Sequence, residues 1–125
     1  MLLNRVLAAV HILVLGTSLS GCMLFDFMFD PPGKGAAAER GYALSAPIIT
    51  ALEKYRLDHA RYPDSLSVLS PTYVPAIPEE EIKDGRLGYL RRGDSYELSF
   101  TYGPPGRNIC VYRSSEEQWS CYGYY

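Results

Sequence analysis

A strict alternation of polar and apolar side chains over residues 95–102 constrains the fold of this chain more than any other feature. The apolar members are Tyr96, Leu98, Phe100 and Tyr102. A period of two places them on one face of a β-strand and the polar residues between them on the other. A turn at Gly93-Asp94 would pair this strand with residues 86–90. The resulting register sets three pairs opposite each other, namely Leu87 with Phe100, Tyr89 with Leu98, and Arg91 with Tyr96.

A second hairpin is predicted after the break at Gly103-Pro104-Pro105-Gly106. Its strands are NICVYR (108–113) and QWSCYG (118–123), and four residues join them. A turn centred between Ser115 and Glu116 sets Cys110 opposite Cys121. Opposed residues of antiparallel strands lie about 4.5 to 5.5 Å apart at Cα, a separation that a disulfide can span. We therefore expect a Cys110–Cys121 disulfide, which would fix the register and bring two rings of this hairpin together.

A helical pattern precedes the strands. Residues recur at steps of three to four along one helix face, through Ile48, Leu52, Tyr55 and His59. Pro47 allows two interpretations, a helix that starts at a Ser45 cap or a kinked helix that starts near Ala36. The helix-forming residues 36–39 favour the kinked helix. Pro63 is expected to end it, because the residue before a proline avoids helical angles.

The stretch between the helix and the strands is expected to be a packed connection. Asp64 can cap one short helical turn over residues 66–69. Three prolines then forbid a long regular element: Pro71, Pro75 and Pro78. The acidic run 79–81 is expected to face solvent. The order of elements predicts an α+β domain, in which one N-terminal helix packs on an antiparallel sheet of about four strands arranged as two hairpins.

The first 21 residues have the pattern of a secretory signal. A single charge, Arg5, precedes an apolar run of about ten residues, too short for a hydrocarbon core that needs roughly 20. The run ends in Leu19-Ser20-Gly21-Cys22, which resembles the lipobox of bacterial lipoproteins and implies cleavage before a lipidated Cys22. An uncleaved anchor, or an ordinary signal in which Cys22 is incidental, is the alternative. Residues 22–35 would then form a tether and residues 36–125 the globular domain.

Cysteine usage and charge agree with an exported protein. The chain has three cysteines, and lipidation of Cys22 would leave one even pair for an oxidising compartment. Its 12 Lys and Arg and 14 Asp and Glu give a formal net charge of −2, so no basic footprint for nucleic acid is present. In lipoproteins of enteric-type bacteria an Asp after the lipidated cysteine retains the protein in the inner membrane. Met23 at that position therefore implies the outer membrane, facing the periplasm.

Aromatic residues of the last hairpin and the C-terminus form the main candidate binding surface. They are Tyr112, Trp119, Tyr122, Tyr124 and Tyr125. Exposed, these rings would make a platform for sugar or protein, whereas packed against the helix they would be core. Catalysis is not expected, because His59 is the single histidine after the signal and no nucleophile motif such as G-x-S-x-G is present. No cofactor and no zinc site are expected either.

The order of elements resembles the periplasmic domain of pseudopilins of bacterial type II secretion systems and related pilin-like proteins. The matching stretches are ALEKYRLDHARYPDSLSVL (51–69), YVPAIP (73–78) and the strands with their late cysteine pair. The most specific positions are Ala51-Leu52, Tyr55, Asp58 and Tyr62-Pro63. The resemblance covers residues 40–102 and implies a pilin-like fold. Since some pseudopilins bind calcium through loop acids, it also offers three calcium candidates: Asp94, Glu116 and Glu117.

The chain departs from that family at its start. Pseudopilins carry an apolar assembly helix with a glutamate near its N-terminus, and the apolar run here has no such glutamate. The combined features predict a lipid-anchored, non-catalytic envelope protein that binds another component of the envelope or of a secretion or pilus apparatus. The alternative is a lipoprotein that binds or processes cell-wall glycan through its aromatic C-terminal hairpin.

Overall fold

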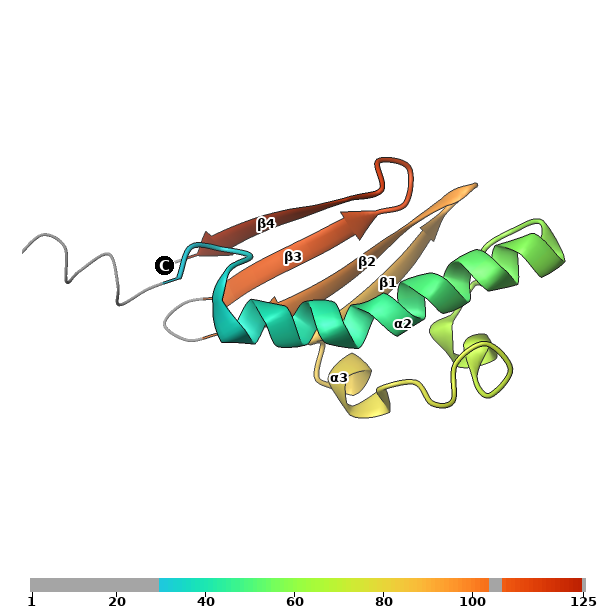
Figure 1. Ribbon diagram of the computed structural model, residues 1–125, viewed down its shortest axis with the longest axis horizontal. Helices are drawn as coiled ribbons and strands as arrows, with labels where there is room; N and C mark the ends of the chain where they lie inside the picture. The colour runs from blue at the N-terminus through green and yellow to red at the C-terminus, as the bar shows by residue number, and fades with distance from the viewer. Residues whose placement is uncertain (1–29, 104–106, 125) are drawn as a thin grey trace, which may run out of the picture. The chain divides into compact units, whose positions relative to one another are not determined.

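The computed structural model describes residues 30–103 and 107–124. The elements in chain order are α2 (Gly35–His59), the 3-10 turn η1 (Leu66–Leu69), α3 (Glu79–Lys83), β1 (Leu87–Arg92), β2 (Ser95–Tyr102), β3 (Arg107–Arg113) and β4 (Gln118–Tyr124). Helix α2 runs across one side of the sheet, and η1 and α3 lie in the connection to β1 (Figure 1). The α+β class is therefore confirmed, with one correction of position, because the helix occupies residues 35–59 rather than the N-terminus.

The four strands form an antiparallel sheet in the order β1-β2-β3-β4. The expected register of the first hairpin is confirmed, with Leu87 opposite Phe100 and Tyr89 opposite Leu98. The second hairpin also has its expected register, with Cys110 opposite Cys121. Alternation and turn position were sufficient to fix these pairs, because a slip of one residue would turn every buried ring of β2 toward solvent.

Helix α2 is continuous through Pro47, whose ring lies on the exposed side of the helix. The predicted helix end is wrong by a few residues. The helix stops at His59, where Ala60 adopts a left-handed conformation (φ 58°, ψ 14°) and donates its N–H to the Arg56 carbonyl. That αL cap closes the last turn, so Pro63 acts on a chain that has already left the helix.

One local prediction in the connection also needs correction. Ser65, not Asp64, caps η1, because its hydroxyl accepts the Ser67 N–H. Asp64 instead pairs with Arg91 at 3.1 Å. The acidic run 79–81 forms the first turn of α3, with Glu79 and Glu80 exposed to solvent as expected, and carboxylates are favoured there by the positive end of the helix dipole.

The core lies between α2, the connection and one side of the sheet. Its fully buried members include Ile48, Ala51, Leu52, Leu69, Leu98 and Cys110. Two tyrosines, Tyr62 and Tyr96, are also buried, with ring centroids 4.7 Å apart. In residues 30–103 and 107–124, no helix combines the length and the apolar character needed to cross a membrane.

Candidate functional site

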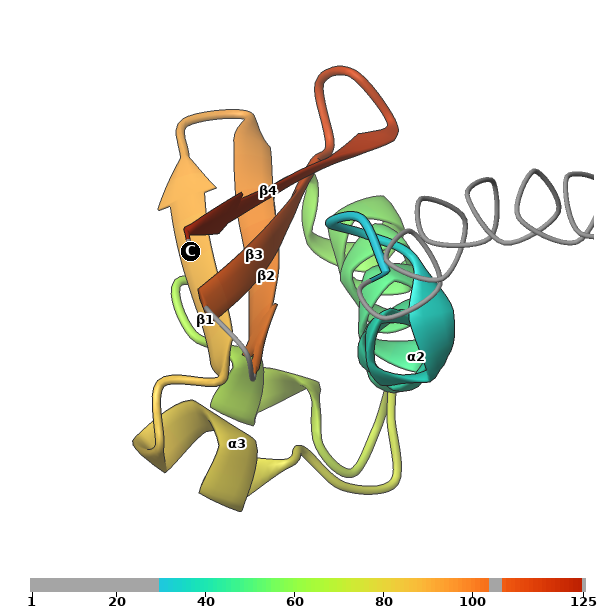
Figure 2. The same cartoon turned by 90° about the vertical axis from the view of Figure 1, so that its left-hand side faces the viewer.

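Alternation gives the sheet two different sides. The side that faces α2 carries large side chains, among them Leu87, Tyr89, Tyr96, Leu98, Phe100, Cys110, Tyr112 and Trp119. The opposite side, which we call the open face, carries small, charged and a few apolar residues: Gly88, Leu90, Arg92, Glu97, Ser99, Ile109, Val111, Arg113, Ser120 and Tyr122. In Figure 2 the helix lies on one side of the sheet only.

A layer of rings fills the space under the N-terminal half of α2. Trp119 lies 5.2 Å from the Tyr42 ring and 5.2 Å from the Phe100 ring, measured between centroids. Tyr112 continues the layer, at 5.4 Å from Trp119. Edge-to-face and tilted ring pairs of this kind stabilise a core beyond the area that they bury. Tyr112 and Trp119 are therefore half-buried packing residues in this structure.

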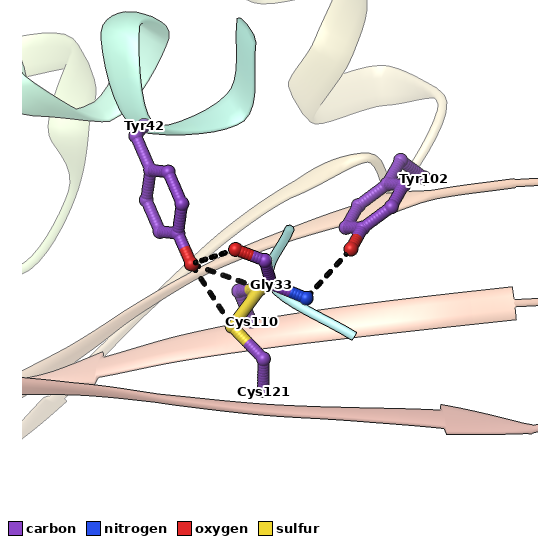
Figure 3. The surroundings of a disulfide bond; sticks show 5 residues. All are labelled: Gly33, Tyr42, Tyr102, Cys110 and Cys121. Atoms are coloured by element: carbon purple, nitrogen blue, oxygen red, sulfur yellow. Dashed lines mark hydrogen bonds between the residues drawn. A yellow bond between two sulfur atoms is a disulfide. The ribbon is translucent and has the colours of Figure 1, made fainter. Parts of the chain in front are cut away.

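The disulfide Cys110–Cys121 is present and lies at the junction between the helix and the segment before it. The Tyr42 hydroxyl contacts Cys121 Sγ at 3.3 Å and donates a hydrogen bond to the Gly33 carbonyl at 3.1 Å. The Gly33 N–H donates in turn to the Tyr102 hydroxyl at 2.8 Å (Figure 3). Gly33 has φ +83°, and a Cβ there would lie 2.8 Å from the Cys121 sulfur. Only glycine fits this position. The hydrogen bonds to Tyr42 and Tyr102 hold it against the sheet.

A polar network holds the chain that follows α2. Arg56 Nη1 donates to the Tyr62 hydroxyl at 3.0 Å, and that hydroxyl donates to Glu53 Oε1 at 3.0 Å. Burial raises the pKa of Tyr62 and, more strongly, that of Tyr96. Burial also raises the pKa of Tyr89 to about 12, while its hydroxyl donates to the Pro63 carbonyl at 2.6 Å. These hydroxyls are protonated at neutral pH and have partners. Those of Tyr62 and Tyr96 bond to side chains of α2, and that of Tyr89 holds the backbone at Pro63.

The open face contains a shallow groove that crosses the strands. Its floor is one cross-strand row of mostly small residues: Gly88, Ser99, Val111 and Ser120. Over β1 to β3 the hollow has a volume of about 270 Å³ and is lined by Leu90, Glu97 and Val111 among others. Leu90 is 49% exposed and Tyr122 is 41% exposed. Two large apolar side chains thus stand on either flank of a floor that contains no bulky residue except Val111.

Charge is arranged at one end of this groove. Glu97 accepts from Arg92 Nε and from Arg113 Nε, each at 3.3 Å. All three residues belong to the open face, where two guanidinium groups surround one carboxylate. Ion pairs at such an exposed site add little stability, but they fix the orientation of the arginines beside the floor of small residues. The groove therefore presents a floor of small residues, apolar side chains at its flanks and a weakly cationic border.

The structure divides the predicted aromatic surface. Tyr112 and Trp119 lie on the helix side, and Tyr122 lies on the open face across from Ile109. Tyr124 is described only as the last residue of β4, and Tyr125 lies outside the described residues. The predicted lipidation site Cys22 also lies outside them. The described rings of the set do not share one surface.

The calcium candidates lie in the turns at one end of the sheet. Asp94 is exposed in the β1–β2 turn, and Glu116 and Glu117 are exposed in the β3–β4 turn. Among the described residues, no three His, Cys, Asp or Glu side chains gather as a metal-binding group. His59 ends α2 and stacks on Tyr55, with ring centroids 3.9 Å apart.

Sequence reasoning missed the open face as a candidate. Part of its signal was nevertheless present, because the predicted hairpins already paired Gly88 with Ser99 and Val111 with Ser120, but the pairing of β2 with β3 that joins them into one row was not predicted. The attachment of Gly33 to the disulfide could not be found in the same way, since no periodic pattern links residues so far apart in the chain. No family model, no curated protein and no solved structure matches this chain.

Proposed function

We propose that this protein is a lipid-anchored, non-catalytic component of the bacterial cell envelope whose pilin-like domain binds another envelope, secretion or pilus protein through the open face of its sheet. The observation that carries the binding proposal is the groove, where Leu90 and Tyr122 stay exposed beside a floor of small residues. Half-exposed apolar side chains next to fixed arginines are typical of protein contacts.

The proposed anchor is supported by the sequence Leu19-Ser20-Gly21-Cys22. The pilin-like assignment is supported by the arrangement of a long helix on an antiparallel meander with a late disulfide. The residues that carry the resemblance, such as Leu52 and Tyr62, are buried. Buried residues support the fold. Which partner is bound would depend on the residues of the exposed groove. We place the protein at the outer membrane, facing the periplasm.

The anchor is tested by metabolic labelling with a fatty-acid analogue. We expect the wild-type chain to be labelled and to sediment with membranes. The Cys22→Ser variant should carry no label and should leave the membrane fraction. A labelled Cys22→Ser chain, or an unlabelled wild type that retains residues 1–21, contradicts the anchor.

The binding face is tested by site-specific photocrosslinking of the full chain in living cells. A photoreactive residue at Leu90 should capture an envelope protein, whereas the same residue at Leu57 should not. Leu57 is a matched control, because it is also an exposed leucine (85%) and lies on α2. Leu90→Glu should abolish co-purification of the captured protein, and Leu57→Glu should preserve it. Equal capture at both positions would refute the open face as the binding site.

A further inference from the structure

Strand β4 forms one edge of the sheet, and among residues 30–103 and 107–124 the backbone groups on its outer side have no partner. The Cα atoms of Cys110 and Cys121 are 4.1 Å apart, the short separation of a non-hydrogen-bonded pair. Even-numbered residues of β3 therefore direct their N–H and C=O groups toward β2, in agreement with the hydrogen bond from the Ser114 N–H to the Tyr96 carbonyl. The backbone groups of Trp119, Cys121 and Gly123 consequently point away from β3.

Within the described part of the chain, nothing pairs with these groups. Gly33 lies against the Cys121 side chain, but its own N–H and C=O bond to Tyr102 and Tyr42. Figure 1 shows no helix or strand of the described residues along the outer side of β4. A row of free donors and acceptors is a template for another strand.

The two edges of the sheet differ in protection. Strand β1 ends in Arg91 and Arg92 and has α3 in contact with it, and such charges and covering elements block edge pairing. Strand β4 has the sequence QWSCYGY, without charge or proline. As far as the described residues go, only the β4 edge is therefore open to a partner strand, which favours a closed pair of molecules over an open chain of them.

We propose that β4 pairs antiparallel with β4 of a second copy of this chain, about a two-fold axis through Cys121. The side chains of β4 are complementary to themselves in that register. Trp119 would lie opposite Gly123 of the second copy on the helix side, where the glycine adds no side chain that could displace the indole ring from its packing against Tyr42 and Phe100. Ser120 would lie opposite Tyr122 of the second copy on the open face. Each large side chain thus meets a small one.

The pairing joins the two sheets into one. Because both Cys121 side chains lie on the same face, the two-fold axis is perpendicular to the sheet and both helices stay on one side. The two open faces then form a single continuous surface on the other side. This inference is independent of the lipid anchor and of the identity of any other partner.

The test uses the full chain, extracted in mild detergent, and two double variants at the same positions. In the double variant Ser120→Glu with Tyr122→Glu, each new carboxylate lies opposite a carboxylate of the second copy, which gives two repulsive pairs. Ser120→Lys with Tyr122→Glu sets opposite charges there instead. By sedimentation equilibrium we expect a dimer for the wild type and for the Lys/Glu variant. The Glu/Glu variant should be monomeric, with dimerisation weakened at least about tenfold.

Hydrogen exchange on the wild type supplies a readout that needs no variant. The amides of Trp119, Cys121 and Gly123 should be protected at dimer concentrations and should exchange rapidly after dilution. Those of Ser120 and Tyr122, which bond to β3, should stay protected at both concentrations. A monomeric wild type, a dimeric Glu/Glu variant, or rapid exchange at Cys121 in the dimer would each overturn the proposal.

Discussion

The two sides of the sheet are built from the same four strands, yet they have almost nothing in common. The helix side is filled by rings and branched side chains, and residues such as Leu98 and Tyr96 are fully buried there. The open face alternates with it residue by residue and carries glycine, serine and arginine. Adjacent residues in one strand therefore lie in different environments, one packed under α2 and the other on the open face, which we propose as the binding surface.

This contrast explains why a fold-level pattern gives little information about binding. Every strong signal in the sequence belongs to the helix side, including the alternating rings and the cysteine pair. The open face has weak sequence signals because solvent tolerates many residue types. Paired substitutions on the two sides can test how complete the separation is.

The largest effect is expected for Leu98→Ala. Its side chain is fully buried, and truncation of a buried leucine costs about 2 to 5 kcal/mol. The adjacent substitution Ser99→Ala, on the open face, should change the free energy of unfolding by no more than about 0.5 kcal/mol. Urea unfolding followed by circular dichroism measures both. Similar losses for the two variants would mean that the open face is also part of the core.

Removal of the disulfide should have the next largest effect. In Cys110→Ala with Cys121→Ala, the closed loop is short, since the cysteines are 11 positions apart. We expect a loss of about 2 to 3 kcal/mol. Reduction of the wild type with a thiol should lower the urea midpoint of unfolding by about as much as the double substitution does. If both treatments leave the midpoint unchanged, the bridge contributes nothing to stability.

Two glycines allow a third comparison. Gly41 lies in α2, where it faces the sheet, and Gly88 lies in β1 on the open face. A Cβ at Gly41 would overlap the buried ring of Phe100, so Gly41→Ala should cost about 1 to 2 kcal/mol despite the better helix propensity of alanine. A Cβ at Gly88 would meet only the Ser99 hydroxyl, at 2.7 Å, which can rotate away. Gly88→Ala should therefore be neutral or slightly stabilising. Thermal unfolding of the pair distinguishes the two sides directly.

The smallest effect is expected for Tyr89→Phe, which removes the hydrogen bond to the Pro63 carbonyl. The cost at neutral pH should be about 0.5 to 1.5 kcal/mol. Because burial raises the pKa of Tyr89 to about 12, its stabilising effect is fully present below pH 10. It is lost as the pH rises through 12. Stability should therefore fall less steeply above pH 10 in Tyr89→Phe than in wild type, and parallel pH profiles would contradict this assignment.

Most of the fold could be predicted because its pattern is periodic. The strand alternation and the turn at Gly93-Asp94 predicted the register of β2, and the turn centred between Ser115 and Glu116 predicted that of β4, with the two cysteines opposite each other. Prediction failed at two element boundaries, the end of α2 and the cap of η1, where the choice between neighbouring residues is local and leaves no periodic pattern. Ala60 ends α2 through a left-handed cap, a conformation that alanine rarely adopts. Ser65 directly precedes η1 and caps it, whereas Asp64, one residue earlier, pairs with Arg91.

The candidate site was less predictable than the fold. The sequence grouped Tyr112, Trp119 and Tyr122 by their proximity in the chain, and strand geometry then separated them onto two sides. Alternation along the predicted strand would have revealed this separation, because Trp119 and Tyr122 are three positions apart and must therefore point to opposite faces. The groove also depends on which side α2 covers, and that choice is set by the summed burial of many residues rather than by any single motif.

The contact between Gly33 and the disulfide has a mechanical consequence. A pull on the chain upstream of Pro31 reaches Gly33 first, where hydrogen bonds to Tyr42 and Tyr102 connect it to the helix and to the sheet. The load is thereby shared between α2, β2 and the crosslinked hairpin before the first turn of the helix is strained. Tension from the N-terminal side would thus be carried as shear across the domain, and α2 would be spared from being peeled away one turn at a time.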